Sequence, residues 1–388
     1  MDHYDVIVIG TGGIGSAATW HLARRGARVL GLDRFPGGHA EGSSHGETRI
    51  IRKAYFEHPD YVPLLERAYA LWAEIEAASG ETLFRRVGLL EGGPAEGVLV
   101  RGIREAAARH ALPLEDIVPG DPESGPPMRL PGGAVGVLEK DAGFLFVERS
   151  VLAHLRMAAA AGADIVSGDA VLGWQAEEGG VTVRTAAKSY RADRLAITAG
   201  AWASGLLSGL AIPLTVRRKH LHWFACDDPR YSAERDCPCF FFETPVGLFY
   251  GFPQVGSGGV KVAEHTRGTD VASPLGDDKA IEPDDLARVT AFIRDCLPGV
   301  STTPVRHAVC YYTLSPDEHF IVDRHPAHAN VAFVAGLSGH GYKFAPVLGE
   351  ILAELALDGT TRQPVGFLGL DREGLRGEGY AGPVGPPG

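Results

Sequence analysis

The stretch Asp5-Val-Ile-Val-Ile-Gly10-Thr-Gly12-Gly-Ile-Gly15 decides the fold of this chain. Its first half is short, rich in β-branched residues and stopped by glycine, a pattern that predicts a buried parallel strand. Residues Ile14–Arg25 carry a helical pattern, and Arg28–Asp33 predicts a second strand. The chain therefore opens with a strand, a helix and a strand within about 30 residues, which is the length of a β–α–β unit.

Three glycines in this stretch have separate tasks in a dinucleotide-binding turn. Gly10 permits the tight turn, Gly12 lets the backbone approach a pyrophosphate, and Gly15 allows the helix to pack closely on the strand. The helix N-terminus offers unpaired N–H groups to the phosphates. Asp33 ends the second strand, where a carboxylate can accept hydrogen bonds from ribose hydroxyls. The motif in this context predicts a bound dinucleotide and leaves the choice between FAD and NAD open.

The composition limits the classes of protein to which the chain can belong. A length of 388 residues exceeds one typical core of about 100–200 residues, so we expect two domains. The formal net charge of -11 argues against nucleic acid as a partner, because nucleic-acid binders usually carry a basic face. No apolar run reaches the roughly 18 residues that a membrane span needs, and a secretory signal pattern is absent from the first residues. We expect a cytoplasmic protein that binds neither nucleic acid nor membrane.

The cysteines favour the same compartment. Five cysteines, an odd number, give no dense disulfide framework and fit reducing conditions. Cys237 and Cys239 are too close together for a redox pair or the usual half of a zinc site. We interpret them as structural residues and predict no metal.

Farther along the chain, patterns typical of parallel and antiparallel sheets alternate. β-rich stretches are found at residues 181–184 and 194–197, a buried strand is expected at 330–336, and an antiparallel sheet is expected within 213–262. The helical patterns cover Tyr61–Ala78, Val151–Ala161, Asp284–Leu297 and Lys343–Leu357. Residues 119–133 and the last dozen residues are expected to be irregular. The order predicts a nucleotide domain assembled from separated segments, with a sheet domain inserted twice.

Several longer motifs identify a family that this sequence resembles. They are Gly42-Ser43-Ser44-His45-Gly46-Glu47-Thr48-Arg49-Ile50-Ile51-Arg52, then Tyr250-Gly251-Phe252-Pro253, Lys261, His265-Thr266, the segment from His307 to Thr313, Asp317-Glu318-His319-Phe320, and the segment from Gly336 to Phe344. In this order they resemble the monomeric sarcosine oxidases and N-methyl amino acid oxidases of the D-amino acid oxidase-like superfamily. The resemblance covers nearly the whole chain.

The resemblance implies a fold of mixed α/β and α+β class. A Rossmann-like FAD-binding domain would be built from the discontinuous segments 1–82, 143–212 and 311–388. Residues 83–142 and 213–310 would form an inserted substrate domain with a large antiparallel sheet.

The same resemblance implies FAD joined through its 8α-methyl group to the sulfur of Cys310. The bond would fix the ring and change its electronic properties. A plain buried cysteine is the alternative reading of Cys310. The resemblance and the glycine motif together predict a set of cofactor-binding residues. They are Gly10, Gly12, Gly15, Asp33, Ser43, Thr48, Gly200, Cys310, Gly339, Gly341 and Lys343.

Four cations carry the substrate prediction, although any one of them alone is more often a solvated surface charge. By resemblance, Arg52 and Lys343 bind the substrate carboxylate, and arginine suits a planar carboxylate because its donors form a fork. Lys261 resembles an oxygen-activating lysine, since an ammonium stabilises anions that form as oxygen is reduced. Arg49 is expected beside the flavin ring.

The neutral side chains of the site are predicted from the motifs alone. His45 is expected beside the ring, with a catalytic role. Tyr250, Tyr312 and His265 resemble residues that line the amine pocket, although aromatic packing is nearly as good an account of them. Phe240, Phe241 and Phe242 are bulkier than the same stretch of some sarcosine oxidases, which puts the size of the preferred substrate in doubt.

The predicted reaction is oxidation of sarcosine or a related N-methyl or cyclic amino acid. The product imine would hydrolyse to an amino acid and an aldehyde, and O2 would become hydrogen peroxide. One alternative is an FAD-dependent dehydrogenase or deaminating oxidase that acts on a cyclic or primary amine. A non-catalytic flavin-binding subunit and an NAD-dependent dehydrogenase are weaker alternatives. The resemblance also implies a monomer.

Overall fold

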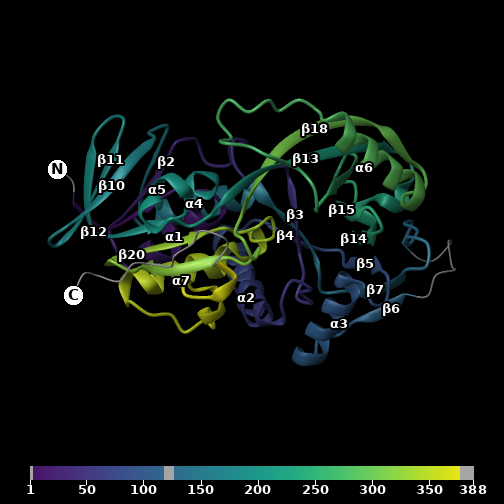
Figure 1. The fold of residues 1–388 in the computed structure, drawn as a ribbon, viewed down its shortest axis with the longest axis horizontal. Helices are drawn as coiled ribbons and strands as arrows, with labels where there is room; N and C mark the ends of the chain where they lie inside the picture. The colour runs from purple at the N-terminus through teal and green to yellow at the C-terminus, as the bar shows by residue number, and fades with distance from the viewer. Residues whose placement is uncertain (1–2, 118–125, 376–388) are drawn as a thin grey trace.

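The computed structural model describes residues 3–117 and 126–375. Figure 1 shows two large sheets at opposite ends of the molecule, and a smaller sheet lies between them. Part of the irregular stretch predicted at 119–133 and the last dozen residues lie outside the described range, so those predictions are tested only for residues 126–133, which contain no helix or strand.

The predicted strand–helix–strand unit is confirmed at the start of the chain. It consists of β1 (His3–Ile9), α1 (Gly13–Arg24) and β2 (Val29–Asp33), and the two strands pair in parallel with Val6 opposite Val29. Buried apolar side chains fill both strands, as is typical of a parallel sheet that is covered on both faces. The unit places the glycine-rich turn at the carboxyl end of β1, where α/β sheets bind ligands.

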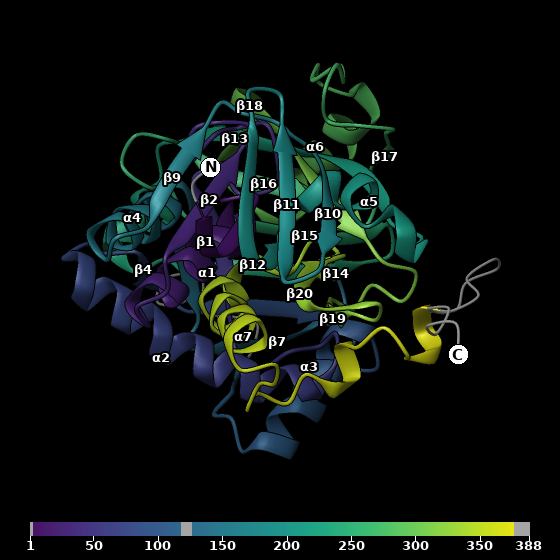
Figure 2. The same cartoon turned by 90° about the vertical axis from the view of Figure 1, so that its left-hand side faces the viewer.

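The first large sheet has eight strands and combines segments that are distant in the sequence. Strands β9, β2, β1, β12 and β20 run in parallel, while β10, β11 and β19 pair antiparallel at the edges. The later strands are β9 (Asp164–Ser167), β10 (Val171–Glu177), β11 (Gly180–Thr185), β12 (Ser189–Ile197), β19 (Ile321–His325) and β20 (His328–Ala335). Its arrangement is visible in Figure 2, with α1 and α7 beside it.

The helices that cover this sheet confirm the helical predictions with shifted ends. They are α2 (Val62–Ser79), α4 (Val147–Ala160) and α7 (Ala345–Leu357), and α1 packs against both α4 and α7. The prediction that Lys343 begins the last helix is wrong by two residues, because Tyr342–Phe344 forms a separate 3-10 turn before α7. Pro346 explains the break, since proline is tolerated only in the first turn of a helix. A four-residue helix, α5 (Ala203–Leu206), follows β12.

The second large sheet has nine strands, in the order β17, β13, β16, β15, β14, β5, β7 and β6, with β18 also paired to β13. Its strands are β5 (Leu89–Gly93), β6 (Glu115–Ile117), β7 (Val135–Glu139), β13 (Thr215–Cys226), β14 (Cys239–Thr244), β15 (Gly247–Phe252), β16 (Val260–Glu264), β17 (Thr269–Asp270) and β18 (Val300–Leu314). The sheet is antiparallel, as predicted, except that β5 and β14 pair in parallel. That pairing joins the two inserted segments.

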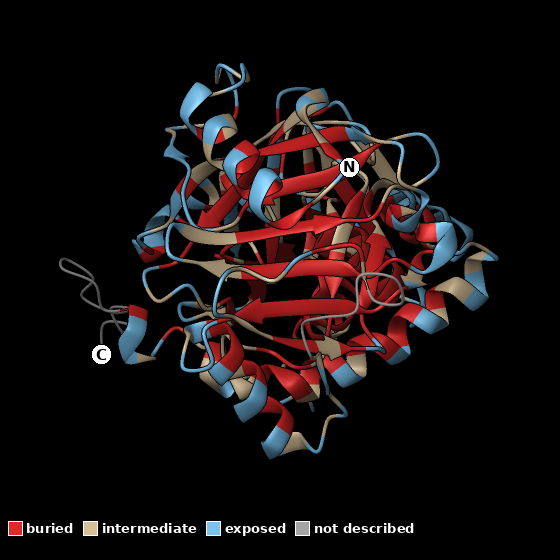
Figure 3. Cartoon of the chain, turned by 90° about the vertical axis from the view of Figure 1, so that its right-hand side faces the viewer, coloured by how far each residue is buried: buried red, intermediate tan, exposed pale blue. Residues whose placement is uncertain are grey.

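Two helices lie on this second sheet. The predicted helix is α6 (Pro283–Cys296), and α3 (Val98–His110) is a helix that the sequence patterns did not indicate. Figure 3 shows that the strands of this half are mostly buried, while the outer faces of the helices are exposed. A third sheet of three strands, β3 (Thr48–Ile51), β8 (Gly143–Phe146) and β4 (Phe84–Arg86), connects the halves.

The division into two domains stays a prediction, and its proposed segments can be compared with the strands of the two large sheets. Strands of the first sheet fall within the proposed FAD-binding segments, and those of the second fall within the proposed substrate segments. β18 is the exception, because it runs continuously across the boundary proposed at residues 310 and 311.

Within the described residues, helices of sufficient length and apolarity to cross a membrane are absent.

Candidate active site

The glycine-rich turn is tight for steric reasons that the structure makes explicit. Gly10 has φ +87, and a Cβ added to it would lie 2.6 Å from the carbonyl oxygen of Thr198. A Cβ on Gly15 would lie 1.7 Å from the carbonyl oxygen of Gly10, so α1 can pack this closely on β1 only through glycine. Ser44 completes the turn by accepting a hydrogen bond from the backbone N–H of Gly13 at 3.0 Å.

A large cavity begins at this turn and extends toward the second sheet. Of the predicted cofactor residues, those that line it are Gly10, Gly12, Asp33, Ser43, Gly200, Gly339 and Gly341. Arg49, Tyr311 and Tyr312 line its far end. Gly15, Thr48, Cys310 and Lys343 do not line it. Gly15 acts through packing, and the other three are buried close to the cavity's far end.

The donors and acceptors of this cavity fit a dinucleotide. The loop at the start of α1 presents backbone N–H groups, and a Cβ on Gly12 would meet nothing closer than the Ser44 hydroxyl at 3.6 Å, so the cavity reaches the backbone there. Asp33 accepts hydrogen bonds from the backbone N–H groups of Thr11, at 2.6 Å, and Phe35, at 2.9 Å. These bonds hold the carboxylate at the cavity wall, where it retains lone pairs for ribose hydroxyls.

Cys310 lies on β18 immediately before Tyr311 and Tyr312, both of which line the large cavity. Its side chain is 1% exposed and faces the same side of the sheet as Lys219, its direct partner on β13. Arg49 and Tyr250 are close enough to interact electrostatically with the thiol. The cysteine is thus at the end of the large cavity that is farthest from the glycine turn.

A smaller cavity adjoins the large one and contains both predicted carboxylate-binding cations. Arg52 is 3% exposed, and one of its terminal nitrogens donates hydrogen bonds to Glu57 at 2.8 and 2.9 Å. Its Nε lies 3.5 Å from Glu91. Burial opposes the charge of Arg52, but Glu57 and Glu91 raise the pKa of its guanidinium above the usual value. The guanidinium also lies over Phe241, 5.3 Å from the ring centroid.

Lys343 reaches the same cavity from the turn before α7. Its ammonium donates to the carbonyl of His340 at 2.8 Å and to the hydroxyl of Tyr55 at 3.3 Å. Burial, followed by the charge of Arg52, lowers the pKa of Lys343 to about 7. An anion in the cavity would reverse part of that shift, because an opposite charge favours the protonated amine.

Uncharged side chains form the wall opposite these two cations. The hydroxyl of Tyr312 is 3.2 Å from Nδ1 of His265, and Tyr250 is hydrogen-bonded to Tyr312. Burial, followed by the charge of Lys219, lowers the pKa of His265 to about 3, so the imidazole is neutral at pH 7. Burial raises the pKa of Tyr250 to about 12. Tyr312 and Arg49 line both cavities, so each of these side chains can contact a ligand in either cavity.

Lys261 lies on β16 behind the motif that contains His45 and Arg49. Its ammonium donates to the carbonyls of Gly46, at 2.6 Å, and Thr48, at 2.9 Å. Burial, followed by the charge of Arg49, lowers the pKa of Lys261 well below its usual value. His45 lines a separate cavity with Gly46, and burial lowers the pKa of its imidazole to about 3. Neither residue lines the two cavities described above.

Several residues at these cavities were not predicted from the sequence. Glu57 pairs with Arg52, Phe241 and His340 line the smaller cavity, and Ser44 holds the glycine turn. From the sequence, Phe241 was singled out only for its size. The five-residue spacing from Arg52 to Glu57 could not have predicted their ion pair, because many charged residues have this spacing.

Among the residues that the structure describes, no group of three or more His, Cys, Asp or Glu side chains could hold a metal ion.

The comparison with family models gives one match over most of the chain. Residues 5–355 match the model described as FAD dependent oxidoreductase. Solved structures agree with this match. The open form of NikD, titled an unusual amino acid oxidase essential for nikkomycin biosynthesis, has a TM-score of 0.84 at 26% identity and covers 95% of this chain and 98% of its own. L-proline dehydrogenase from P. horikoshii shares the fold, with a TM-score of 0.80 at 20% identity over 95% of this chain and 97% of its own.

Curated relatives are more similar in sequence. Monomeric sarcosine oxidase from Bacillus sp. (strain B-0618) is 39% identical over 380 residues, which is 96% of this chain and 97% of that protein. N-methyl-L-tryptophan oxidase from Salmonella enteritidis PT4 is 38% identical over 361 residues, which is 92% of this chain and 96% of that protein. With these matches over nearly the full length and the glycine-lined cavity above, the chain belongs to the FAD-dependent oxidoreductase family, among the relatives of monomeric sarcosine oxidase.

Proposed function

We propose that this protein oxidises the N-alkyl C–H bond of sarcosine or a closely related secondary amino acid. One observation carries the proposal: Arg52 and Lys343 are buried in one small cavity that shares Arg49 and Tyr312 with the glycine-lined cavity. Buried cations need an anionic partner or a function, because burial of charge costs free energy. Arg52 already has Glu57 as its partner, and the carboxylate of a small amino acid would supply a partner for Lys343 and a replacement for Glu57 at Arg52.

The carboxylate would exchange with Glu57 at Arg52. In the described structure Glu57 occupies the arginine's donors, so a substrate carboxylate would have to compete with Glu57 for them. Lys343 would supply a second positive charge in the same cavity. Two fixed cations would hold the substrate in one orientation. Correct orientation of the reacting groups supplies much of the rate acceleration.

The amine would lie toward Tyr312, Tyr250 and His265. None of these three is charged at pH 7, since burial raises the pKa of both tyrosines and lowers that of His265. Such a wall accepts a neutral amine more readily than an ammonium ion, because nothing in it neutralises a positive charge. The chain would therefore bind the unprotonated amine and would need no strong general base.

FAD would be held by the glycine turn at Gly10 and Gly12, by Asp33, and by the loop at Gly339 and Gly341. When bound, it would accept two electrons and one proton, the equivalent of a hydride, from the substrate's N-alkyl carbon. We propose the thioether to Cys310 because this cysteine lies on the strand that ends the large cavity, next to Tyr312. Arg49, shared by the two cavities, would stabilise negative charge that develops at their junction.

Oxygen would react near Lys261. Burial disfavours its ammonium in the described structure, and an anion nearby would restore the charge. A cation that is stabilised only when an anion forms favours the reduction of O2, whose first products are anionic. Hydrogen peroxide would be the final product, and the imine would be hydrolysed to glycine and formaldehyde in the case of sarcosine. A monomeric state and a cytoplasmic location complete the proposal as predictions from the family.

A panel of amines with a peroxide readout tests the proposed function. We expect turnover with sarcosine and other small N-methyl or cyclic amino acids, and far less with N-methyl amines that lack a carboxylate. The panel should include N-methyl-L-tryptophan and primary amino acids, since the alternative is a dehydrogenase or deaminating oxidase for cyclic or primary amines. Substrate oxidation with an artificial acceptor but without peroxide would favour the dehydrogenase. Equal activity with amines that have a carboxylate and amines that lack one would contradict the roles of Arg52 and Lys343.

A further inference from the structure

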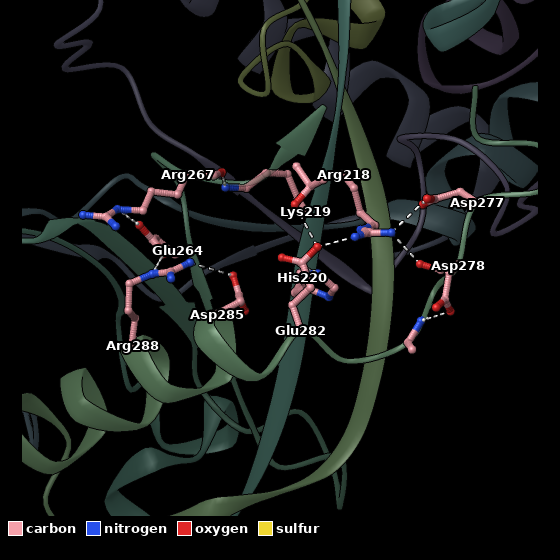
Figure 4. Close-up of polar contacts among 12 residues, drawn as sticks. Arg218, Lys219, His220, Glu264, Arg267, Asp277, Asp278, Glu282, Asp285 and Arg288 are labelled. Carbon is pink, nitrogen blue, oxygen red and sulfur yellow. Dashed lines mark hydrogen bonds and ion pairs between the residues drawn. The ribbon is translucent and has the colours of Figure 1, made fainter. Parts of the chain in front are cut away.

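Lys219 is a buried lysine that the proposed mechanism does not use. It lies on β13 with 1% of its surface exposed, directly opposite Cys310 on β18. Its ammonium donates to the backbone carbonyl of Arg267, as Figure 4 shows, and lies 5.5 Å from the centroid of the Tyr312 ring. Lysine is almost never fully buried unless it is paired, so its partners decide what the charge can do.

The charged groups around Lys219 leave it without a carboxylate of its own. Two carboxylates are close, Glu264 on β16 and Asp285 on α6. Glu264 is already paired with Arg288 at 2.7 Å, as Figure 4 shows. Asp285 is paired with His222 at 2.8 Å. The other titratable and charged groups that face Lys219 are Arg217 on its own strand, Cys310 and Tyr312 on β18, and His265 and Arg267 after β16. Arg217 is paired in turn with Asp270 at 2.6 Å, so each of these carboxylates among the described residues has an ion-pair partner other than Lys219.

The positive charge of Lys219 reaches the smaller cavity. Tyr312, whose ring the ammonium approaches, and His265 both line that cavity. After burial, Lys219 is the largest influence that lowers the pKa of His265. Burial lowers the pKa of Lys219 itself only to about 8, so most of the side chain stays protonated at pH 7. A fixed cation is therefore present behind the wall where the amine would lie.

We propose that Lys219 is a positioning residue that makes the amine end of the pocket positive and so favours the neutral form of the bound amine. This inference rests on the proposed function. A positive potential raises the free energy of an ammonium ion and leaves a neutral amine unaffected, so it lowers the pKa of the bound amine. Lys219 touches neither the cavity nor the reacting atoms, and its effect passes through Tyr312 and His265.

The expected size of the effect follows from Coulomb's law. At a separation on the order of 10 Å and an effective dielectric constant of about 20, one unit charge changes a pKa by about one unit. The pH profile of kcat reports groups in the enzyme–substrate complex, which include the bound amine. Loss of the charge should move the acid limb of that profile to higher pH by about one unit.

The test compares Lys219→Met with Lys219→Arg. We expect the methionine variant to shift the acid limb of kcat upward by about one unit and to reach kcat within a few fold of wild type at high pH. The arginine variant should keep the wild-type limb, because it keeps the charge. Lys219→Gln, which can still donate to the Arg267 carbonyl, should behave as Lys219→Met does and serves if the methionine variant does not fold. Lys188→Met, which removes an exposed lysine, is the matched control.

A ligand without an amine separates this effect from damage to the pocket. A carboxylate that carries a thioether sulfur in place of the nitrogen should perturb the flavin absorbance of Lys219→Met and wild type with similar affinity at every pH. The inference would be overturned if Lys219→Met lowered kcat equally at every pH without moving the acid limb. It would also be overturned if Lys219→Arg showed the same shifted limb as Lys219→Met. Wild-type protein that oxidises no amine would overturn the proposed function and this inference with it, whereas an unshifted limb in an active enzyme overturns only the role of Lys219.

Discussion

Arg52 donates two hydrogen bonds to the carboxylate of Glu57, at 2.8 and 2.9 Å, inside the cavity that is proposed to bind the substrate. The pair is almost fully enclosed, with the two side chains 3% and 13% exposed. Burial opposes the charge of Glu57, but Arg52 outweighs it and lowers the pKa of that carboxyl group. The arginine is thus held in place by an internal anion that a substrate carboxylate would have to replace.

Glu57→Gln should strengthen the binding of carboxylate ligands by about tenfold. In the wild type the ligand binds only to molecules in which Arg52 has left Glu57, so its apparent affinity is reduced by the fraction of such molecules. Titration of the flavin absorbance with a competitive carboxylate measures the change. Glu66→Gln, on the exposed face of α2, is the control. Weaker binding in Glu57→Gln would mean that the pair positions Arg52 for the ligand instead of competing with it.

The affinity for carboxylate ligands should fall as pH rises through about 7. The pKa of Lys343 is lowered to about 7 by burial and by Arg52, so its ammonium is present below this pH in the free protein and is lost above it. Because a bound carboxylate favours the ammonium, binding above pH 7 requires uptake of a proton, and the dissociation constant should rise up to tenfold per pH unit. A ligand without an amine should be used, so that only the protein titrates. Lys343→Met should bind more weakly at low pH and lose this dependence, and a dependence that persists in the variant would assign it to another group.

Covalent attachment of the flavin is expected to depend on Cys310 alone. Acid precipitation of the purified wild-type protein should give a yellow, fluorescent pellet, and Cys310→Ala should release its flavin into the supernatant. The other four cysteines are also free, which makes Cys296→Ala, in the buried core at the end of α6, a suitable control. A colourless pellet from fully loaded wild-type protein would exclude the thioether.

Lys261→Met should slow the reaction with oxygen far more than the reaction with substrate. Loss of one electrostatic contact in a buried site typically reduces a rate by about 100–1,000-fold, and this side chain is positioned by the carbonyls of Gly46 and Thr48 rather than by the substrate cavity. Anaerobic reduction and aerobic reoxidation, followed separately by stopped-flow absorbance, measure the two half-reactions. Equal loss in both would indicate a structural role, and unchanged reoxidation would remove the proposed one.

Gly15→Ala should lose cofactor and stability together. Its Cβ would lie 1.7 Å from the carbonyl oxygen of Gly10, so α1 would have to move away from β1 and distort the phosphate-binding turn. We expect a loss of about 3 kcal/mol in the free energy of unfolding, measured by urea denaturation, with reduced flavin content. Gly205→Ala is the control, because nothing lies within 4 Å of the added Cβ there. Full flavin content in Gly15→Ala would contradict the packing argument.

The sequence alone was sufficient for features that depend on neighbouring residues. The β-branched run before Gly10, the helix after it and the second strand up to Asp33 form locally, and the tight turn admits few residues other than glycine. Helix ends were less predictable. Lys343 was expected inside the last helix, yet it lies in a 3-10 turn, because the local pattern does not show where tertiary packing lets the regular helix begin.

What the sequence by itself determined is the dinucleotide fold and, through its motifs, the family. Of the four cations that the motifs singled out, Arg49, Arg52 and Lys343 line one cavity and Lys261 does not. Only the tertiary structure decided which groups surround those cations. Arg52 is paired with Glu57, and Lys219 is opposite Cys310 behind Tyr312, because chain segments as distant as β13 and β18 pair side by side. The charge of a buried group depends on the dielectric and the partners that the fold places around it, and neither is encoded in the spacing of residues along the chain.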